Sequence, residues 1–137
     1  KLQLAVVTAE GESFSGEVDM VVAPGGLGEF TVLPSHARMI STLAAGVLRF
    51  DQGADSVSLA MSGGFLEVSD NRVTVLADAA ERDDAIDLER AEIALARAQE
   101  RIAGTTADMD LERATTALRR ARVRVNLGRR RRDRGLS

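Results

Sequence analysis

The order of apolar and polar residues changes its period near residue 80. Before that point, short runs rich in Val, Leu, Phe and Met alternate with glycine and polar clusters. Short strands at such regular spacing, with few helix-length segments between them, indicate an antiparallel β-sandwich. Ser62-Gly63-Gly64, inside strand-like sequence, predicts a bulge or a close approach of two backbones. The predicted strands cover residues 2–8, 18–23, 29–33, 47–50, 56–61, 65–68 and 72–77.

From residue 79 onward the apolar positions recur with helical spacing, at intervals of three and four residues. The pattern predicts two helices separated by a break at Gly104-Thr105-Thr106. The chain is therefore expected to divide into a β-sandwich domain at residues 1–82 and a helical hairpin with an arginine-rich tail at 83–137. The expected helix starts and ends are Asp83 or Asp84 and Gly104 for the first helix, and Asp108 or Asp110 and Gly128 for the second.

The two predicted helices repeat one pattern at an interval of 23 residues. Ile86-Asp87-Leu88-Glu89-Arg90-Ala91 returns as Met109-Asp110-Leu111-Glu112-Arg113-Ala114. Each helix carries an apolar seam in which a large residue alternates with alanine, a pattern that lets antiparallel helices approach closely. So small a core, set against the entropy of ordering the hairpin, predicts marginal stability and a hairpin able to open. The apolar seam consists of Leu88, Ala91, Leu95, Ala98 and Ile102, and of Leu111, Ala114, Leu118, Ala121 and Val125.

Each apolar seam is flanked by a stripe of arginines. At about 100° per residue, the stripe residues of one helix fall within about 80° of one another. Folded as a hairpin, the stripes bring several guanidinium groups near one anion, and the planar guanidinium fork suits phosphate. The alternative is a solvated face with local pairs such as Asp87–Arg90 and Arg97–Glu100. The first arginine stripe is Arg90, Arg97 and Arg101, with Asp87 beside it; the second is Arg113, Arg120 and Arg124, with Asp110 beside it.

The net charge of −3 conceals a strong asymmetry along the chain. Residues 1–112 hold 8 basic and 20 acidic side chains, whereas residues 113–137 hold ten Arg against Asp133. This asymmetry predicts either association of the two regions or an acidic partner. The run from Arg129 to Arg134 suits nucleic acid, anionic lipid or an acidic protein surface, or forms a disordered, solvated tail. Without interleaved aromatic residues it has no platform for stacking bases.

Several functional classes are disfavoured by composition. Cysteine is absent, which excludes disulfides and thiolate metal sites, and no run of about 18 apolar residues predicts a membrane span. His36 is the only histidine and is expected at a turn in a structural role. The glycines at 24–28 precede neither a Gly-Lys-Ser/Thr sequence nor a helix, so they predict no phosphate loop. We expect no catalytic residues, no metal and no obligatory cofactor.

From about residue 4 to residue 125 the sequence resembles a known family, the ε subunit of bacterial and chloroplast-type rotary ATP synthases. Glu29-Phe30-Thr31-Val32 departs from a common Gly-Glu-Leu-Gly-Ile, and Ser35 replaces a common Gly. The segment after Gly128 extends beyond the usual end. The resemblance rests on Gly16-Glu17-Val18-Asp19-Met20-Val21-Val22-Ala23-Pro24-Gly25, Leu33-Pro34-Ser35-His36-Ala37, Ser62-Gly63-Gly64-Phe65-Leu66-Glu67-Val68, and Val73-Thr74-Val75-Leu76-Ala77-Asp78 followed by Ala80-Glu81-Arg82.

The resemblance implies a non-catalytic central-stalk subunit of a proton-translocating ATP synthase, peripheral on the cytoplasmic face of a bacterial energy-coupling membrane. It implies a sandwich bound to the γ subunit and the c ring, and a mobile hairpin. In its extended state the hairpin would meet the α and β subunits, where basic residues of the second helix would contact acidic β-subunit segments and inhibit ATP hydrolysis. The expected inhibitory contacts are Arg113, Arg119, Arg120, Arg122 and Arg124.

In some members of that family the closed hairpin binds one ATP through an Ile/Leu-Asp-x-x-Arg-Ala motif. The resemblance then implies that Arg97, Arg120 and Arg124 neutralise the polyphosphate, while Glu81 and Asp87 hold adenine, ribose or a neighbouring Arg. ATP is thus an expected regulatory ligand. The alternatives are a purely structural coupling subunit with a passive hairpin and, on the arginine tail alone, a nucleic-acid-binding protein. The complete set of expected ATP-binding residues is Glu81, Ile86, Asp87, Arg90, Ala91, Arg97, Arg120 and Arg124.

Overall fold

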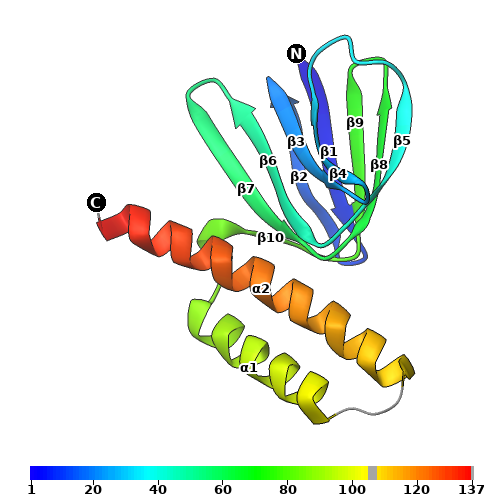
Figure 1. Cartoon of the computed structure of the whole chain (residues 1–137). Coiled ribbons are helices and arrows are strands. Elements are labelled where there is room, and N and C mark those ends of the chain that lie inside the picture. Colours follow the sequence, from blue (N-terminus) through cyan, green and yellow to red (C-terminus); the bar gives the residue numbers. More distant parts are fainter. Residues whose placement is uncertain (105–107, 137) are drawn as a thin grey trace. The chain divides into compact units, whose positions relative to one another are not determined.

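The computed structural model of the chain describes residues 1–104 and 108–136. The chain divides into two compact units, the first covering residues 1–82 and the second beginning at residue 83. Figure 1 shows that the first unit is built of strands and the second of helices. The change in hydrophobic period near residue 80 therefore coincides with the change from one unit to the next.

Within the described residues the first unit contains ten strands joined in one sheet. In chain order these strands are β1 (Leu2–Thr8), β2 (Gly11–Val18), β3 (Met20–Gly25), β4 (Gly28–Val32), β5 (Met39–Leu43), β6 (Gly46–Gln52), β7 (Asp55–Met61), β8 (Gly64–Ser69), β9 (Arg72–Ala77) and β10 (Ala80–Arg82).

The sheet runs in the order β10-β7-β6-β3-β5-β8-β9-β1-β2, and β4 pairs with β3 beside this path. Strand β1 pairs with β9 in parallel, whereas the other pairings are antiparallel. The sheet folds over so that β2 meets β6, where the Gln52 side-chain amide donates a hydrogen bond to the Glu17 carbonyl at 2.9 Å. Beside it the rings of Phe14 and Phe50 lie 4.3 Å apart between centroids. The predicted fold class, a β-sandwich followed by a helical hairpin, is confirmed.

Buried side chains of the strands fill the interior of the sandwich, and on some strands they alternate with exposed ones. On β9, for example, Val73 and Val75 are 1% and 0% exposed, while the side chains between them face outward. Each fully buried aliphatic side chain stabilises the fold by about 1.5–3 kcal/mol relative to the exposed state. Leu4, Leu48 and Leu66 make the same contribution from β1, β6 and β8. The unit therefore has a single continuous apolar core.

Three strands are absent from the sequence prediction of seven. Strand β2 carries mostly polar side chains and lies at the end of the sheet order, so its sequence lacks a buried face. Strand β5 and the three-residue β10 are short, and pairing with β8 and β7 keeps them in the sheet. Backbone pairing with long-range partners, which sequence periodicity does not report, forms these strands.

The close backbone approach predicted at Ser62-Gly63-Gly64 is confirmed. Gly64 has a φ of +144°, and an ideal Cβ there overlaps the Leu76 carbonyl oxygen and lies 2.9 Å from the Ala77 Cα. Gly64 pairs with Ala77 on β9, so β8 begins where the two backbones meet with no room for a side chain. Glycine alone satisfies both the conformation and the spacing.

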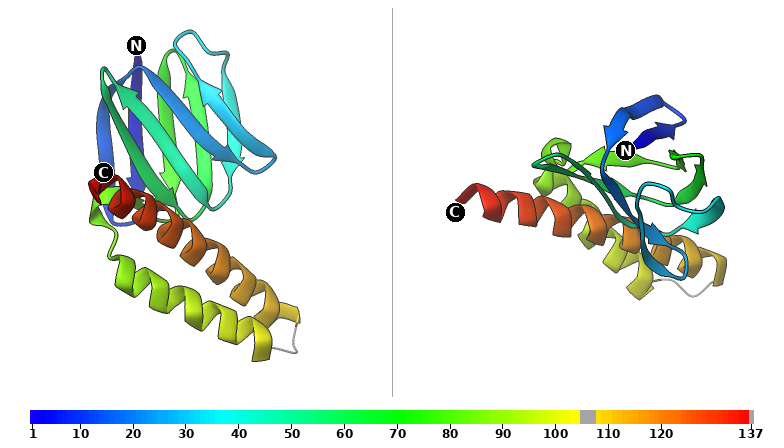
Figure 2. Two further views of the ribbon diagram at one scale, coloured as in Figure 1. Left: turned by 60° about the vertical axis from the view of Figure 1, so that its left-hand side comes forward. Right: turned by 90° about the horizontal axis from the view of Figure 1, so that it is seen from above.

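The second unit begins with a 3₁₀ turn at Asp83–Ala85, followed by α1 (Leu88–Gly104) and α2 (Asp108–Leu136). Figures 1 and 2 show α1 and α2 lying side by side and running in opposite directions. The predicted end of α1 at Gly104 and the start of α2 at Asp108 agree with the structure, whereas Thr105 and Thr106 lie outside the described residues. Neither helix, as described, carries an apolar stretch long enough to cross a bilayer.

The prediction that Gly128 ends the second helix is wrong, because α2 continues to Leu136. An ideal Cβ at Gly128 would lie 3.2 Å from Ile86 Cγ2 and 3.2 Å from Leu88 Cδ1. The glycine therefore serves close packing between segments rather than termination. The disordered tail considered for the segment after Gly128 is wrong for the same reason, since residues 129–136 are helical.

Candidate functional site

Helix α1 is capped by Asp87. The prediction that Asp83 or Asp84 caps this helix is wrong, because both residues belong to the 3₁₀ turn that precedes it. The Arg90 backbone N–H donates to Asp87 Oδ1 at 3.2 Å, and the Ala91 N–H donates to the Asp87 carbonyl at 3.0 Å. This is the hydrogen-bond pattern of an N-cap residue. A carboxylate has further acceptor sites, so capping leaves Asp87 able to accept another donor.

The alanines of the apolar seam are buried, and most of their larger partners are half-buried. Val125 is 1% exposed, whereas Leu111 is 42% exposed. The small residues thus lie at the centre of the helix contact, where their size permits close approach, and the larger ones cover its margins. The buried alanines are Ala91, Ala98, Ala114 and Ala121, exposed by 0%, 3%, 4% and 4%.

The packing of Gly128 against Leu88 sets the register of the two helices. Because the helices are antiparallel, the residue nine positions after Leu88 lies at the same height along the hairpin as the residue nine positions before Gly128. This step brings Arg97 level with Arg119 and Arg120. The centres of the two arginine stripes therefore lie at the same height along the hairpin.

The 23-residue repeat also decides which side of the hairpin the stripes occupy. Two antiparallel helices with equivalent seams are related by an approximate two-fold axis perpendicular to them, and such an axis keeps equivalent flanks on one side of the pair. Both arginine stripes therefore line the same side of the hairpin. Arg97, Arg113 and Arg120 are exposed and Arg124 is half-buried. The shared side concentrates positive charge where it meets solvent.

The other expected ATP-binding residues differ in what they can offer a ligand. Ile86 is half-buried against Gly128, and Ala91 is fully buried in the apolar seam, so both contribute packing rather than polar contacts. Arg90 is exposed at the start of α1. Glu81 lies on β10 of the first unit, whereas the remaining expected residues belong to the second unit.

The five expected inhibitory arginines do not share one face of α2. At about 100° per residue, Arg113, Arg120 and Arg124 fall on one flank of the apolar seam, whereas Arg119 and Arg122 fall on the other. A shallow hollow on α2 is lined by Glu112, Arg113, Thr116, Ala117 and Arg120. Positive charge thus surrounds the outward side of the helix.

Two acidic residues that sequence reasoning did not assign to a site hold the C-terminal part of α2. Arg129 contacts Glu92 of α1, with Nη2 at 3.3 Å from Oε1, and Arg131 Nη1 lies 3.7 Å from Asp83 Oδ1. Asp83 is the one charged residue that is buried among the described residues, at 8% exposure. Local sequence held no signal for these pairs, which join residues far apart along the chain.

His36 occupies the turn where it was predicted. Its backbone N–H donates to the Leu33 carbonyl at 3.2 Å, and its Nδ1 lies 2.7 Å from the Ala37 carbonyl oxygen. Ser35, which stands at a common glycine position, has a φ of 67° and donates its N–H to Asn71 Oδ1 at 2.6 Å. Within the described part of the chain, no three acidic or histidine side chains gather as metal ligands.

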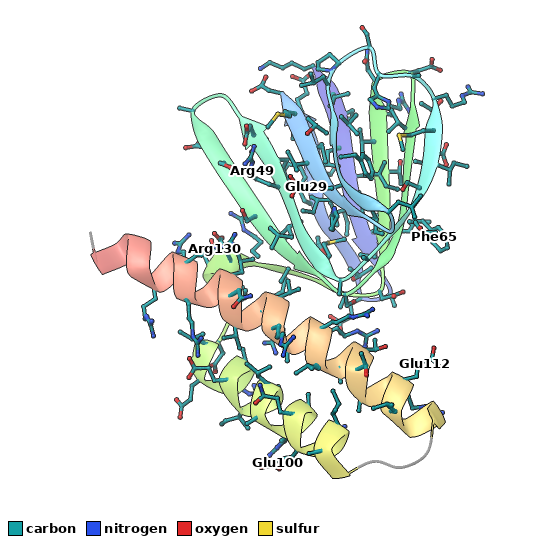
Figure 3. The ribbon with its side chains drawn as sticks, viewed as in Figure 1. Glu29, Arg49, Phe65, Glu100, Glu112 and Arg130 are labelled. Carbon is teal, nitrogen blue, oxygen red and sulfur yellow. The ribbon has the colours of Figure 1, made fainter. Side chains whose placement is uncertain are left out.

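The outward face of β5, β8 and β9 exposes three large apolar side chains, with the polar residues Glu67 and Thr74 beside them. Ile40, Phe65 and Leu76 are 75%, 56% and 55% exposed. Phe65 pairs directly with Leu76, and Ile40 lies on the adjoining strand β5. Figure 3 shows Phe65 pointing away from the sandwich. Exposed apolar side chains on adjoining strands are a feature of interaction surfaces.

A sandwich with an exposed apolar face, followed by a charged helical hairpin, defines an assembly subunit that works through its surfaces. The family profile for the β-sandwich domain of the ATP synthase delta/epsilon chain matches residues 1–83, and that for its long alpha-helix domain matches residues 84–127. The chain belongs to this family, which confirms the resemblance seen in the sequence. It is therefore an epsilon-type, non-catalytic subunit of an ATP synthase.

Curated relatives support this assignment over most of their length. The chain is 50% identical to the ATP synthase epsilon chain of Desulforamulus reducens over 100 residues, covering 73% of this chain and 76% of the relative. It is 51% identical to that of Carboxydothermus hydrogenoformans over 106 residues, covering 77% and 79%.

Solved structures of low identity share the fold. A chain of the Euglena gracilis mitochondrial ATP synthase, solved as OSCP, F1 and c-ring in rotational state 1, matches with a TM-score of 0.77 at 24% identity, covering 87% of this chain and 76% of that chain. A chain of the Tetrahymena thermophila mitochondrial ATP synthase central stalk and c-ring matches with a TM-score of 0.70 at 12% identity, covering 93% and 96%.

Proposed function

We propose that the chain couples rotor to catalytic head in the central stalk of a proton-translocating ATP synthase and inhibits ATP hydrolysis through its helical hairpin. Its sandwich binds the γ subunit and the c ring, and the hairpin, when extended, meets the α and β subunits. The protein then lies peripherally on the cytoplasmic face of a bacterial energy-coupling membrane. The observation that carries the inhibitory role is the charge of α2, which has nine Arg and no acidic residue between positions 113 and 132.

The apolar face of the sandwich supports attachment to the rotor. Ile40, Phe65 and Leu76 expose large side chains on adjoining strands. Covering such side chains stabilises a complex by about 25 cal/mol for each Å² of apolar surface removed from water. A rotor subunit must stay bound while the stalk turns, and apolar burial, unlike exposed ion pairs, is not weakened by ionic screening.

The charge of α2 supports contact with acidic segments of the β subunits. Arginines on both flanks of the helix give it positive potential around its outward side, and such fields attract an acidic surface over about 8–10 Å at physiological salt. Contacts of this kind need charge rather than a fixed orientation. They suit an element that blocks rotation by engaging a partner that moves past it.

The arginine stripes support regulation by ATP. In the antiparallel register Arg97 is level with Arg120, and Arg124 stands one turn further along α2. Guanidinium groups so placed suit a polyphosphate, because each donates parallel hydrogen bonds to phosphate oxygens. The same geometry exists only while the helices are paired, so the ligand selects the closed hairpin.

Because the helices pack weakly, binding of such a ligand can shift the equilibrium between the open and the closed hairpin. The seam centre is alanine, and Leu111 remains 42% exposed, so little apolar surface holds the tip of the hairpin closed. A ligand that binds only the closed state adds about 2.7 kcal/mol of stabilisation at 100 times its Kd. ATP at high concentration would thus keep the hairpin closed and release inhibition of hydrolysis.

Deleting residues from 83 onward tests the inhibitory role in the assembled enzyme. ATP hydrolysis should rise, while assembly, followed by co-purification of the other subunits, stays intact because the sandwich remains. Hydrolysis that stays unchanged would remove the inhibitory role and leave the alternative, a purely structural coupling subunit with a passive hairpin.

Calorimetric titration of the isolated full chain with ATP tests the ligand role. Saturable 1:1 binding is expected, and Arg120→Ala/Arg124→Ala should weaken it at least tenfold, since charged hydrogen bonds contribute about 1.5–3 kcal/mol each. Arg119→Ala/Arg122→Ala is the matched control, because it removes two arginines from the opposite flank of the same helix and should leave affinity within about threefold. No binding at millimolar ATP, or equal loss in both variants, would refute an ATP site at the stripes.

A further inference from the structure

The C-terminal part of α2 lies beyond residue 127, where the match to the long alpha-helix domain ends. It nevertheless packs closely against the beginning of the second unit. Gly128 faces Ile86 Cγ2 and Leu88 Cδ1, each 3.2 Å from the position that a Cβ would occupy. Contact this close depends on the missing side chain.

Two ion pairs flank this contact. The Arg129 guanidinium meets Glu92 on the second turn of α1, with Nε also donating a hydrogen bond at 3.3 Å. The Arg131 guanidinium meets Asp83 of the 3₁₀ turn at 3.7 Å. The side chain of Asp83 is 9% exposed. Burial of a carboxylate carries a desolvation cost, and cationic partners compensate this cost. The conformation that supplies these cations is therefore favoured.

The opposite end of the hairpin shows the contrast. Leu111, a seam residue near the start of α2, is 42% exposed. The apolar seam is thus loosely covered toward the tip, whereas the base is closed by an apolar contact and two ion pairs.

We propose that Asp83, Glu92, Gly128, Arg129 and Arg131 form a base clasp that holds the hairpin closed from its C-terminal end. The base clasp joins the last turns of α2 to the 3₁₀ turn and to the first turns of α1, so α2 separates from α1 only after these contacts break. It sets the closed fraction of the hairpin through the chain's own residues. The inference rests on contacts within the second unit and stands whether or not ATP binds at the arginine stripes.

Amide hydrogen exchange on the intact chain tests the base clasp, with residues 88–93 as the reporter. Arg129→Gln/Arg131→Gln should accelerate exchange there about tenfold, since it leaves two carboxylates without these cations. Arg119→Gln/Arg130→Gln is the matched control, with the same change in charge on the same helix. Figure 3 shows Arg130 on the side of α2 away from α1. The control should change exchange by less than about twofold.

Gly128→Val tests the apolar contact independently of charge. Valine is a better helix former than glycine, so faster exchange at residues 88–93 in this variant can come only from the clash with Ile86 and Leu88. An increase of about tenfold is expected, with exchange in β8 and β9 unchanged, which shows that the sandwich stays folded. Exchange at residues 88–93 that matches the control in both test variants would overturn the base clasp.

Discussion

Replacing Gly64 by alanine probes the close approach that fixes the start of β8. Gly64 has a φ of +144°, which L side chains rarely adopt, and its missing Cβ leaves room for the backbone of β9. Alanine adds one methyl group and no polarity. The change therefore isolates backbone conformation and backbone spacing from every other property of the site.

Two costs add at Gly64. Holding an L residue in a glycine-only conformation costs about 1–3 kcal/mol. The Cβ also overlaps the Leu76 carbonyl oxygen, and displacing backbone in a packed sheet costs about another 1–3 kcal/mol. A unit of 82 residues is expected to have about 4–12 kcal/mol of stability in total. Gly64→Ala should therefore remove about 2–6 kcal/mol of it.

Gly11→Ala is the matched control for conformation alone. Gly11 has a φ of +121°, but nothing lies within 4 Å of its ideal Cβ. Both variants pay for the backbone conformation, and only Gly64→Ala adds the clash. Thermal unfolding followed by far-UV circular dichroism suits a chain with no Trp or Tyr. The Tm of Gly64→Ala should lie below that of Gly11→Ala by about 4–8 °C for each kcal/mol of clash.

Equal Tm values for the two alanine variants would refute this reasoning, because they would show that the β9 backbone yields without cost. A Tm for Gly64→Ala above that of Gly11→Ala would refute it more strongly. Amide exchange on β8 and β9 locates the effect, since the clash should weaken protection there before it reaches β2 or β4.

Three further changes test separate parts of the structure. Leu66→Ala, at a position that is 0% exposed, should destabilise the sandwich by about 2–5 kcal/mol in chemical denaturation; a loss below about 1 kcal/mol would contradict a tightly packed core. Asp87→Ala should weaken α1 by about 0.5–2 kcal/mol, read as faster exchange in its first turn, whereas Asp87→Ser should retain the cap while removing the carboxylate. ATP affinity that falls in both Asp87 variants would assign the carboxylate to the ligand rather than to the helix. Gly104→Ala should stabilise the hairpin slightly, by up to about 1 kcal/mol, because among the described residues no atom lies within 4 Å of its ideal Cβ; destabilisation would show that Gly104 has a conformational role.

The fold class and the family were predictable from the sequence alone. Alternation along β9 and helical spacing along α1 and α2 appear directly in the order of apolar residues, because each depends only on which face of its own element is buried. The 23-residue repeat likewise predicted the apolar seam and both arginine stripes. Ser62-Gly63-Gly64 predicted the close approach, since glycine inside a strand marks a bulge or a point where another backbone comes near.

Tertiary structure alone decided the features that depend on partners distant in the chain. Gly128 has the local signature of a helix end, yet α2 continues through it, and Ile86 and Leu88 each lie 3.2 Å from the position of its ideal Cβ. Asp83 has the local signature of a cap, yet its carboxylate pairs with Arg131 and Asp87 caps α1. Local propensities contribute about 1 kcal/mol at such positions, and contacts between segments brought together by folding outweigh them. The sequence therefore determined which face of each strand and helix is buried, and the tertiary structure determined which residues that face contacts.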